Sequence, residues 1–125
     1  MTSKYRAKKI KIHDIVFDSK KEANRYLQLK ILEDKGKIHG LELQKKFELL
    51  PRQTVTIKRY SEKTGRRLKD KEKVLEKACC YLADFVYYDD KGNLVVEDTK
   101  GFRTPDYIIK RKLMLWVHGI QIKEL

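Results

Sequence analysis

The most constraining feature of this sequence is a hairpin that carries charged residues inside two apolar strands. Residues 79–88 and 94–100 combine aromatic and β-branched side chains in the manner of strands, and a short polar segment, residues 89–93, separates them. Within that segment Asp90-Lys91-Gly92 suits a three-residue loop, a type I turn followed by a left-handed glycine. A loop of defined length fixes which residues of the two strands lie opposite each other.

Counting back from this loop places two aspartates opposite each other. The register pairs Val86 with Val96, so Asp84 falls directly opposite Asp98. Directly opposed side chains in a strand pair have Cβ atoms about 4.5–5.5 Å apart. Two carboxylates at that separation repel each other, and a buried or half-buried pair needs a proton, a cationic partner or a metal. Strand alternation places Glu97 on the opposite face.

Lys100 completes a candidate catalytic group on the face of the two aspartates. It lies two residues beyond Asp98, and the register places it opposite Leu82 and diagonal to Asp84. Carboxylate oxygens at this spacing suit Mg²⁺, with Mn²⁺ as a substitute, because Mg²⁺ bridges carboxylates to a substrate phosphate. The ion would activate a bound water, and Lys100 would orient that water or stabilise charge in the transition state. A surface salt-bridge triad without chemistry is the alternative interpretation.

The remaining sequence predicts one α/β domain, since 125 residues suit a single core. Ser19 and Glu22 fit a capping box at the start of a helix that ends at Lys35-Gly36. The expected apolar stripe of this helix is Ala23, Tyr26, Leu27 and Ile31. Thr104-Pro105 opens a second helix, which Gly119 closes. Helices are expected over residues 19–35 and 104–119, and strands over residues 15–17, 41–50, 53–60, 79–88 and 94–100, with a short terminal strand beginning at 120–122.

The charge balance favours a polyanionic partner. Lys and Arg number 30 against 18 acids, a net charge of +12, and a basic surface attracts nucleic acid. A charge that serves solubility alone is the other interpretation. Two segments concentrate the basic residues: an N-terminal arm, residues 1–12, and a charged insertion, residues 59–77, predicted as a protruding hairpin or loop with an optional short helix near 71–77. Either segment contacts DNA or is simply solvated.

Other classes are disfavoured. The sequence has no run of about 20 apolar residues for a membrane span, and no apolar segment of a signal peptide follows the basic N-terminus. Cys79 and Cys80 are adjacent, whereas zinc sites and redox pairs place two residues between their sulfurs. We expect reduced thiols in a cytoplasmic protein.

An ordered set of motifs runs through nearly the whole chain. It consists of Phe17-Asp18-Ser19-Lys20-Lys21-Glu22-Ala23 with Tyr26, then Gln44, Asp84-Phe85 with Tyr87, Asp98-Thr99-Lys100-Gly101, and Tyr107 with Lys110 and Lys112. This set resembles small phage-encoded proteins of the PD-(D/E)XK nuclease superfamily, similar to Holliday-junction-resolvase-like nucleases. The resemblance implies one nuclease-like domain over residues 1–125, with a mixed sheet flanked by helices in the order αβββαβ.

The resemblance also implies roles for individual residues. Asp84 and Asp98 would be metal ligands, the backbone carbonyl of Thr99 a third ligand, and Lys100 the catalytic lysine. Glu22 resembles the acid of the first helix that completes such sites in junction resolvases. Two departures are tolerated by the motif: Ala83 stands where Pro is common, and the second acid is Asp rather than Glu.

Several assignments stay open at this level. Glu22 is explained either by the capping box or by metal binding, and Gln44 either lines the site or is an ordinary exposed strand residue. Lys110, Lys112, Arg103 and Gln44 are the candidate DNA contacts, although the lysines also suit a solvated helix face.

The favoured function is a Mg²⁺-dependent endodeoxyribonuclease that hydrolyses branched or structured DNA by metal-activated water, working as a homodimer, in the host cytoplasm for a phage-encoded enzyme. The alternatives are a non-catalytic nucleic-acid-binding module on the same fold, and an RNA-directed or protein-binding protein.

Overall fold

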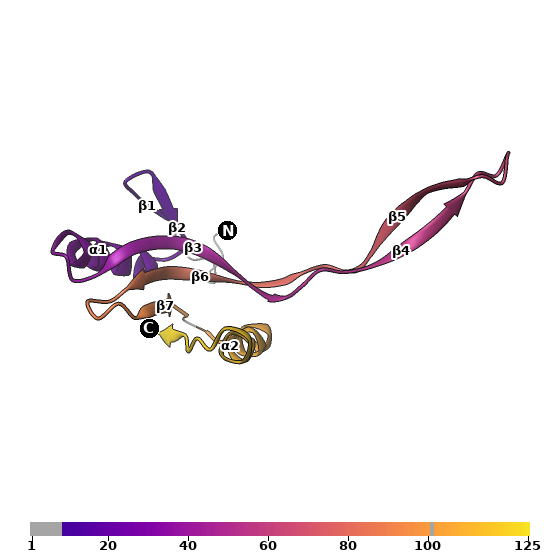
Figure 1. Ribbon diagram of the computed structural model, residues 1–125. Coiled ribbons are helices and arrows are strands. Elements are labelled where there is room, and N and C mark those ends of the chain that lie inside the picture. The colour runs from indigo at the N-terminus through magenta and orange to yellow at the C-terminus, as the bar shows by residue number, and fades with distance from the viewer. Residues whose placement is uncertain (1–8, 101) are drawn as a thin grey trace.

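The computed structural model describes residues 9–100 and 102–125 and shows a mixed α+β body with a long projecting ribbon (Figure 1). The body is built on a four-stranded sheet in the order β3-β6-β7-β8. The strands are β3 (His39–Leu50), β6 (Cys79–Tyr88), β7 (Leu94–Asp98) and β8 (Lys123–Glu124), and its helices are α1 (Lys20–Asp34) and α2 (Pro105–His118). The first three strands are antiparallel neighbours and β8 joins β7 in parallel, so the sheet is mixed, and the order of these elements along the chain is αβββαβ.

Two further hairpins leave this body. β1 (Ile10–Ile12) pairs with β2 (Ile15–Phe17) before α1, so the last residues of the basic arm form a strand, and residues 1–8 lie outside the described residues. β4 (Gln53–Tyr60) pairs with β5 (Arg67–Glu76) in the charged insertion, which is therefore a hairpin.

Several expected elements differ from the structure in type or in bounds. The strand expected over residues 41–50 begins at His39. The optional helix near 71–77 is a strand, because its backbone groups pair with β4 instead of with each other. The strand expected over 94–100 ends at Asp98. The terminal strand begins at Lys123 rather than at 120–122, because Ile122 is buried in the core and the pairing with β7 starts only at Glu97↔Lys123.

Both helices begin and end as their caps predict. The Ser19 hydroxyl accepts a hydrogen bond from the backbone N of Glu22 at 3.1 Å, and the Thr104 hydroxyl does the same for Tyr107 at 3.2 Å. Gly119 ends α2 with φ 67°, a left-handed conformation that glycine adopts at little cost.

The face that α1 turns inward differs from the expected stripe. Leu27 and Ile31 are 40% and 55% exposed, whereas Leu29 is fully buried. The buried residues of α1 are Glu22, Ala23, Tyr26 and Leu29, a helical face at spacings of three and four. This rotation of the helix turns Glu22 toward the sheet.

Two hydrophobic clusters lie on the body, and β3 and β6 contribute to both. From β3 and β6, the cluster next to α1 takes Leu41, Leu43, Phe85 and Tyr87, and the cluster next to α2 takes Phe47, Leu49, Cys79, Tyr81, Ala83 and Val86. The odd-numbered residues therefore belong to one cluster at one end of each strand and to the other cluster at the other end, and the even-numbered Val86, beyond the change, belongs to the cluster next to α2. The change falls at Gln44 and its opposite residue Asp84, within an unshifted stretch of the register. Gln44 has φ 53°, outside the strand region, so a twist of the backbone accompanies the change without an inserted residue.

Within residues 9–100 and 102–125, neither helix has the length and apolar character that crossing a bilayer requires.

The inward face of α1 yields a stability prediction. We expect Leu29→Ala to lower the free energy of unfolding by about 2–5 kcal/mol, because it leaves a cavity in a packed core. Leu27→Ala, the same change two residues away on the exposed side, should cost under about 1 kcal/mol. Urea unfolding of both variants measures the difference. Equal losses would contradict this packing of α1.

Candidate active site

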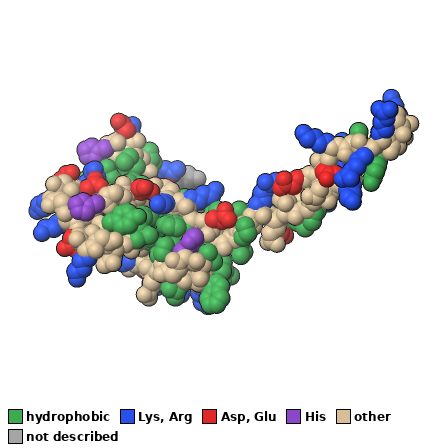
Figure 2. Space-filling model, in the orientation of Figure 1, with side chains coloured by type: hydrophobic (Ala, Val, Ile, Leu, Met, Phe, Trp, Pro, Cys, Tyr) green, Lys and Arg blue, Asp and Glu red, His purple; other side chains and the backbone are tan. Residues whose placement is uncertain are grey.

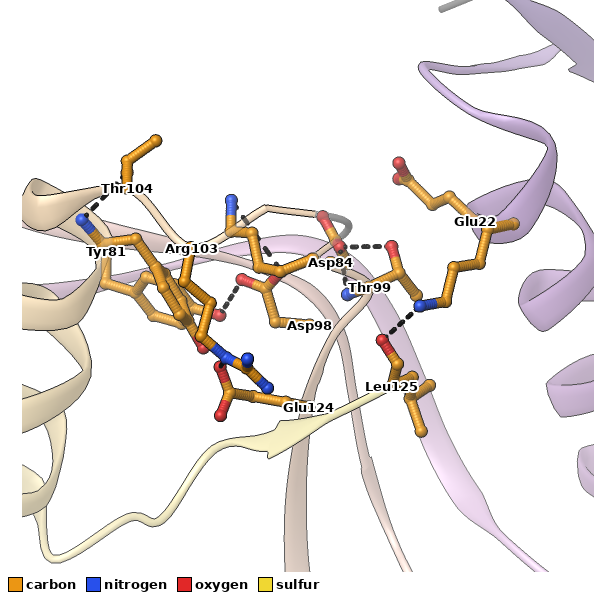
Figure 3. A network of polar contacts seen from close by, with 12 residues as sticks. Glu22, Tyr81, Asp84, Asp98, Thr99, Arg103, Thr104, Glu124 and Leu125 are labelled. Carbon is orange, nitrogen blue, oxygen red and sulfur yellow. Dashed lines mark hydrogen bonds and ion pairs between the residues drawn. The ribbon is translucent and has the colours of Figure 1, made fainter.

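Three carboxylates from three elements gather at one place in the body, as Figure 3 shows. Glu22 comes from the first turn of α1, Asp84 from the middle of β6, and Asp98 from the last residue of β7. The pairing of β6 with β7 is Phe85↔Glu97 and Val86↔Val96 without a shift, so the register predicted from the turn is confirmed for these pairs. Continued by one residue, it sets Asp84 opposite Asp98.

Asp98 is the most deeply buried of the three. It is 1% exposed, and its Oδ2 accepts a hydrogen bond from the Tyr81 hydroxyl at 2.5 Å. Within the described residues its Oδ1 has no hydrogen-bond partner, and the Lys100 Nζ lies 3.8 Å from it. Burial raises the pKa of Asp98, and the nearby Asp84 raises it further, while Tyr81 and Lys100 lower it. A buried carboxylate with an unbonded oxygen is a position where a cation would be stabilised.

Tyr81 of β6 also reaches Asp98, although Leu82, expected opposite Lys100, is the residue predicted on the face of the two aspartates. Leu82 is 52% exposed. The expectation assumed strict alternation along β6. Because the strand changes the cluster that it faces at Asp84, Tyr81 takes the inward position and Leu82 turns to solvent.

Asp84 is held by the chain segment that follows β7. Its Oδ2 accepts hydrogen bonds from the backbone N and the Oγ1 of Thr99, both at 2.9 Å. These two donors fix the orientation of the carboxylate and leave Oδ1 directed to its other neighbours. The observed contacts of Thr99 are thus to Asp84, and the metal-binding role of its carbonyl stays a prediction.

Gln44 lies between Glu22 and Asp84 and connects them. Its Nε2 donates to Glu22 Oε1 at 3.1 Å and lies 3.5 Å from Asp84 Oδ1. Gln44 therefore lines the site. Ser19 forms its half of the capping interaction through the backbone of Glu22, while the carboxylate of Glu22 points toward Gln44.

Glu22 is held in an unfavourable setting for a negative charge. The residue is 7% exposed, and burial, followed by the charges of Asp84, Asp18 and Asp98, raises its pKa from 4.5 to about 7. The hydrogen bond from Gln44 opposes this shift. A carboxylate that is half protonated near neutral pH is a group that a cation would deprotonate.

Lys100 stands at the rim of the site beside a second feature. Its Nζ lies 5.1 Å from the centre of the Tyr107 ring, in a cation–π contact. A pocket of about 190 Å³ opens there, lined by Tyr81, Leu82, Lys100, Thr104, Asp106, Tyr107 and Lys110. Lys100 and Lys110 thus share one recess next to the carboxylates.

Lys112 and Arg103, two further expected DNA contacts, do not line this pocket. Lys112 is exposed and is not among the residues that line this pocket, because a two-residue step on a helix turns by about 200°. Arg103 donates through Nε to Glu124 at 2.7 Å, an exposed ion pair that ties the start of α2 to β8. The structure therefore groups Lys110, but not Lys112, with the site.

Glu97 faces away from the site, as strand alternation predicts. It is fully buried and accepts two hydrogen bonds from Arg25, at 2.7 and 2.6 Å, and one from the Tyr87 hydroxyl. This fork attaches α1 to the far face of β7. Sequence reasoning missed both Arg25 and Tyr81, because nothing in their spacing separates them from ordinary surface arginines and core tyrosines.

The donor set suits a hard cation, although the acids are not closed around one point. Among residues 9–100 and 102–125, no group of three or more His, Cys, Asp or Glu is spaced to hold a metal. Gln44 occupies the gap between Glu22 and Asp84, and its amide would have to turn its oxygen inward or move aside. The buried, unbonded Oδ1 of Asp98 and the all-oxygen character of the cluster fit Mg²⁺.

Fold and site define a mixed α+β domain with a carboxylate cluster and an adjacent lysine. Residues 2–122 match the family model described as "Protein of unknown function (DUF1064)", and the chain belongs to this family. No curated protein and no solved structure matches the chain.

The raised pKa of Glu22 gives a test of the cluster. The folded chain binds this proton more tightly than the unfolded chain, so stability falls as pH rises from 4.5 to about 7. We expect wild type to lose more stability across this window than Glu22→Gln, measured by urea unfolding with a chelator present. Gln keeps the helix cap and cannot ionise. Identical pH profiles would show that Glu22 does not carry this strain.

Proposed function

We propose that this protein is a Mg²⁺-dependent endodeoxyribonuclease of the PD-(D/E)XK type. The observation that carries the proposal is the buried, unbonded Oδ1 of Asp98, which has Lys100 3.8 Å away. Asp84 and Glu22 add their negative charges from two other elements. A structural salt bridge would not need three mutually repelling acids in one place. The sequence motifs that resemble the superfamily contain the same four residues.

In this proposal some residues would bind the metal ion, and others orient the residues that bind it. Asp84 and Asp98, joined by Glu22, would hold Mg²⁺. Such an ion supplies Lewis-acid activation of the scissile phosphate and of a water. Thr99 and Tyr81 fix the orientations of the two aspartates through their hydrogen bonds. The side chain of Lys100 is 39% exposed at the rim of the site, where it would contact a phosphate oxygen and offset the charge that grows during hydrolysis.

DNA is the substrate in this proposal. The net charge of +12 supplies the attraction for a polyanion, and the recess of Lys100 and Lys110 offers two cations to the backbone next to the acids. Branched DNA is the preferred class, on the resemblance to junction resolvases. Cutting both strands of a branch requires two sites, so we also propose a homodimer, which light scattering of the DNA-bound protein tests.

Cleavage assays test the enzyme directly. We expect wild type to cut a four-way junction, a flap or duplex DNA with Mg²⁺ or Mn²⁺ and not with a chelator. Asp98→Asn should lower kcat by at least about a hundredfold, because it removes a charge that holds the metal. Asp90→Asn, in the exposed turn of the same hairpin, is the matched control and should retain full activity.

Two results would overturn the proposal. One is binding of every substrate without cleavage, which would favour a non-catalytic binding module on this fold. The other is cleavage that survives Asp98→Asn at the wild-type rate.

Substitution of the two lysines of α2, one at a time, distinguishes a specific phosphate contact from a general effect of positive charge. We expect Lys110→Ala to raise KM by about three- to tenfold, since Lys110 shares the recess of Lys100. Lys112→Ala removes the same charge two residues away and should change KM less than twofold. Steady-state cleavage kinetics at fixed salt provide the measurement, and equal effects would contradict the assignment.

A further inference from the structure

The β4–β5 hairpin projects from the body as a two-stranded ribbon (Figure 1). Every residue of both strands is exposed, including Val55, Ile57 and Leu68 at 41%, 39% and 40%. A ribbon of this kind contributes nothing to the core of the body, and an isolated two-stranded hairpin is at best marginally stable in water. We therefore expect the ribbon to bind a partner that covers part of its exposed surface.

The register divides the ribbon into two unlike faces. Directly opposed residues share a face, and one face carries the pairs Val55↔Lys73 and Ile57↔Lys71. A register shift in β5 follows, and alternation along β4 keeps Arg59, paired with Leu68, on the same face. We name these six residues the basic face. It combines three cations with three aliphatic side chains, and none of its six residues is acidic; Glu76 lies opposite Gln53 at the base of the ribbon.

The acids of β5 are placed so that they leave the basic face unneutralised. Glu72 lies on the other face, opposite Thr56, and forms an ion pair with Arg52 at 3.3 Å. Asp70 forms an ion pair with Arg67 at 2.9 Å. Among residues 9–100 and 102–125, no ion pair involves Arg59, Lys71 or Lys73. Figure 2 shows Lys and Arg side chains along the ribbon as far as its tip.

We propose that the ribbon lies in the major groove of duplex DNA with its basic face inward. The major groove of B-form DNA, about 12 Å wide, admits a two-stranded ribbon. Eight residues of β4 extend over about 25 Å, roughly three quarters of a turn of the duplex. Arg59, Lys71 and Lys73 reach the phosphates or base edges, while Val55 and Ile57 contact the apolar edges of bases such as the thymine methyl.

A second copy of the chain fits this face poorly. Two basic faces packed on each other would bring six cations together without an acid between them, and like charges in contact are repelled. The polyanion is the complementary partner. This inference rests on the proposed choice of DNA as substrate, and it adds a second contact region, distant from the carboxylates, that holds the duplex.

Binding without metal tests the ribbon independently of cleavage. Full-length protein is titrated onto a fluorescent duplex DNA of 30 base pairs in chelator, at several salt concentrations. We expect Arg59→Gln/Lys71→Gln to weaken binding at least about tenfold and to reduce the slope of log K against log salt by about two. The matched control, Lys58→Gln/Arg67→Gln, removes the same charges from the other face of the same ribbon and should stay within about twofold of wild type.

The outcomes are decisive in both directions. Equal weakening by the two variants, or none by either, would overturn the basic face, as would equal affinity for a double-stranded RNA of the same length, whose deep and narrow major groove excludes a ribbon. Circular dichroism of each variant verifies that the ribbon is still folded. Wild type that binds as expected but never cuts would leave the ribbon standing and the nuclease overturned. Cleavage by wild type with unchanged binding of Arg59→Gln/Lys71→Gln would do the reverse.

Discussion

The structure depends on two adjacent acids that are buried on opposite faces of the short strand β7. Glu97 and Asp98 are 0% and 1% exposed, and a buried charge must be answered within the body. The Glu97 carboxylate accepts two hydrogen bonds from the Arg25 guanidinium and one from the Tyr87 hydroxyl, which compensate its charge and attach α1 to β7. Asp98 accepts one hydrogen bond, from Tyr81, and its other oxygen has only the Lys100 ammonium group at 3.8 Å. Because the buried charge of Asp98 is not fully compensated, its face of β7 is the candidate for chemistry. The face of Glu97, whose charge is compensated, attaches α1 to the sheet.

The site also lies where the two hydrophobic clusters meet. At Gln44 and Asp84 the odd-numbered residues of β3 and β6 change from one cluster to the other, and Gln44 adopts φ 53° there. A non-glycine residue in this conformation costs free energy, which the packing on both sides must offset. In return its amide reaches Glu22 and Asp84 together. The polar cluster therefore sits between two packed regions that keep its parts from drifting.

The features that depend on local sequence rules, the strand register and the helix ends, could be predicted from the sequence. The turn at Asp90-Lys91-Gly92 set the register of β6 and β7, and the caps at Ser19, Thr104 and Gly119 set the helices. Sequence reasoning failed where tertiary packing decides. Strict alternation placed Leu82 where Tyr81 lies, since no sequence signal marks the twist at Gln44. The alternating Lys and acidic residues of β5, Lys69 to Lys73, suit a helix as well as a strand, and only pairing with β4 selects the strand. The ion pair of Arg25 with Glu97 joins residues 72 positions apart and leaves no local trace.

The β4–β5 ribbon has a geometric consequence for how such a protein changes over evolutionary time. It follows β3 and leads into β6, the two strands that hold Gln44 and Asp84, and only residues 51–52 and 77–78 separate the ribbon from them. Each pair of residues added to both strands lengthens the ribbon by about 7 Å and preserves which side chains share a face. The hairpin thus acts as a ruler: its reach is adjustable in steps of two residues while the body that holds the acids is left untouched.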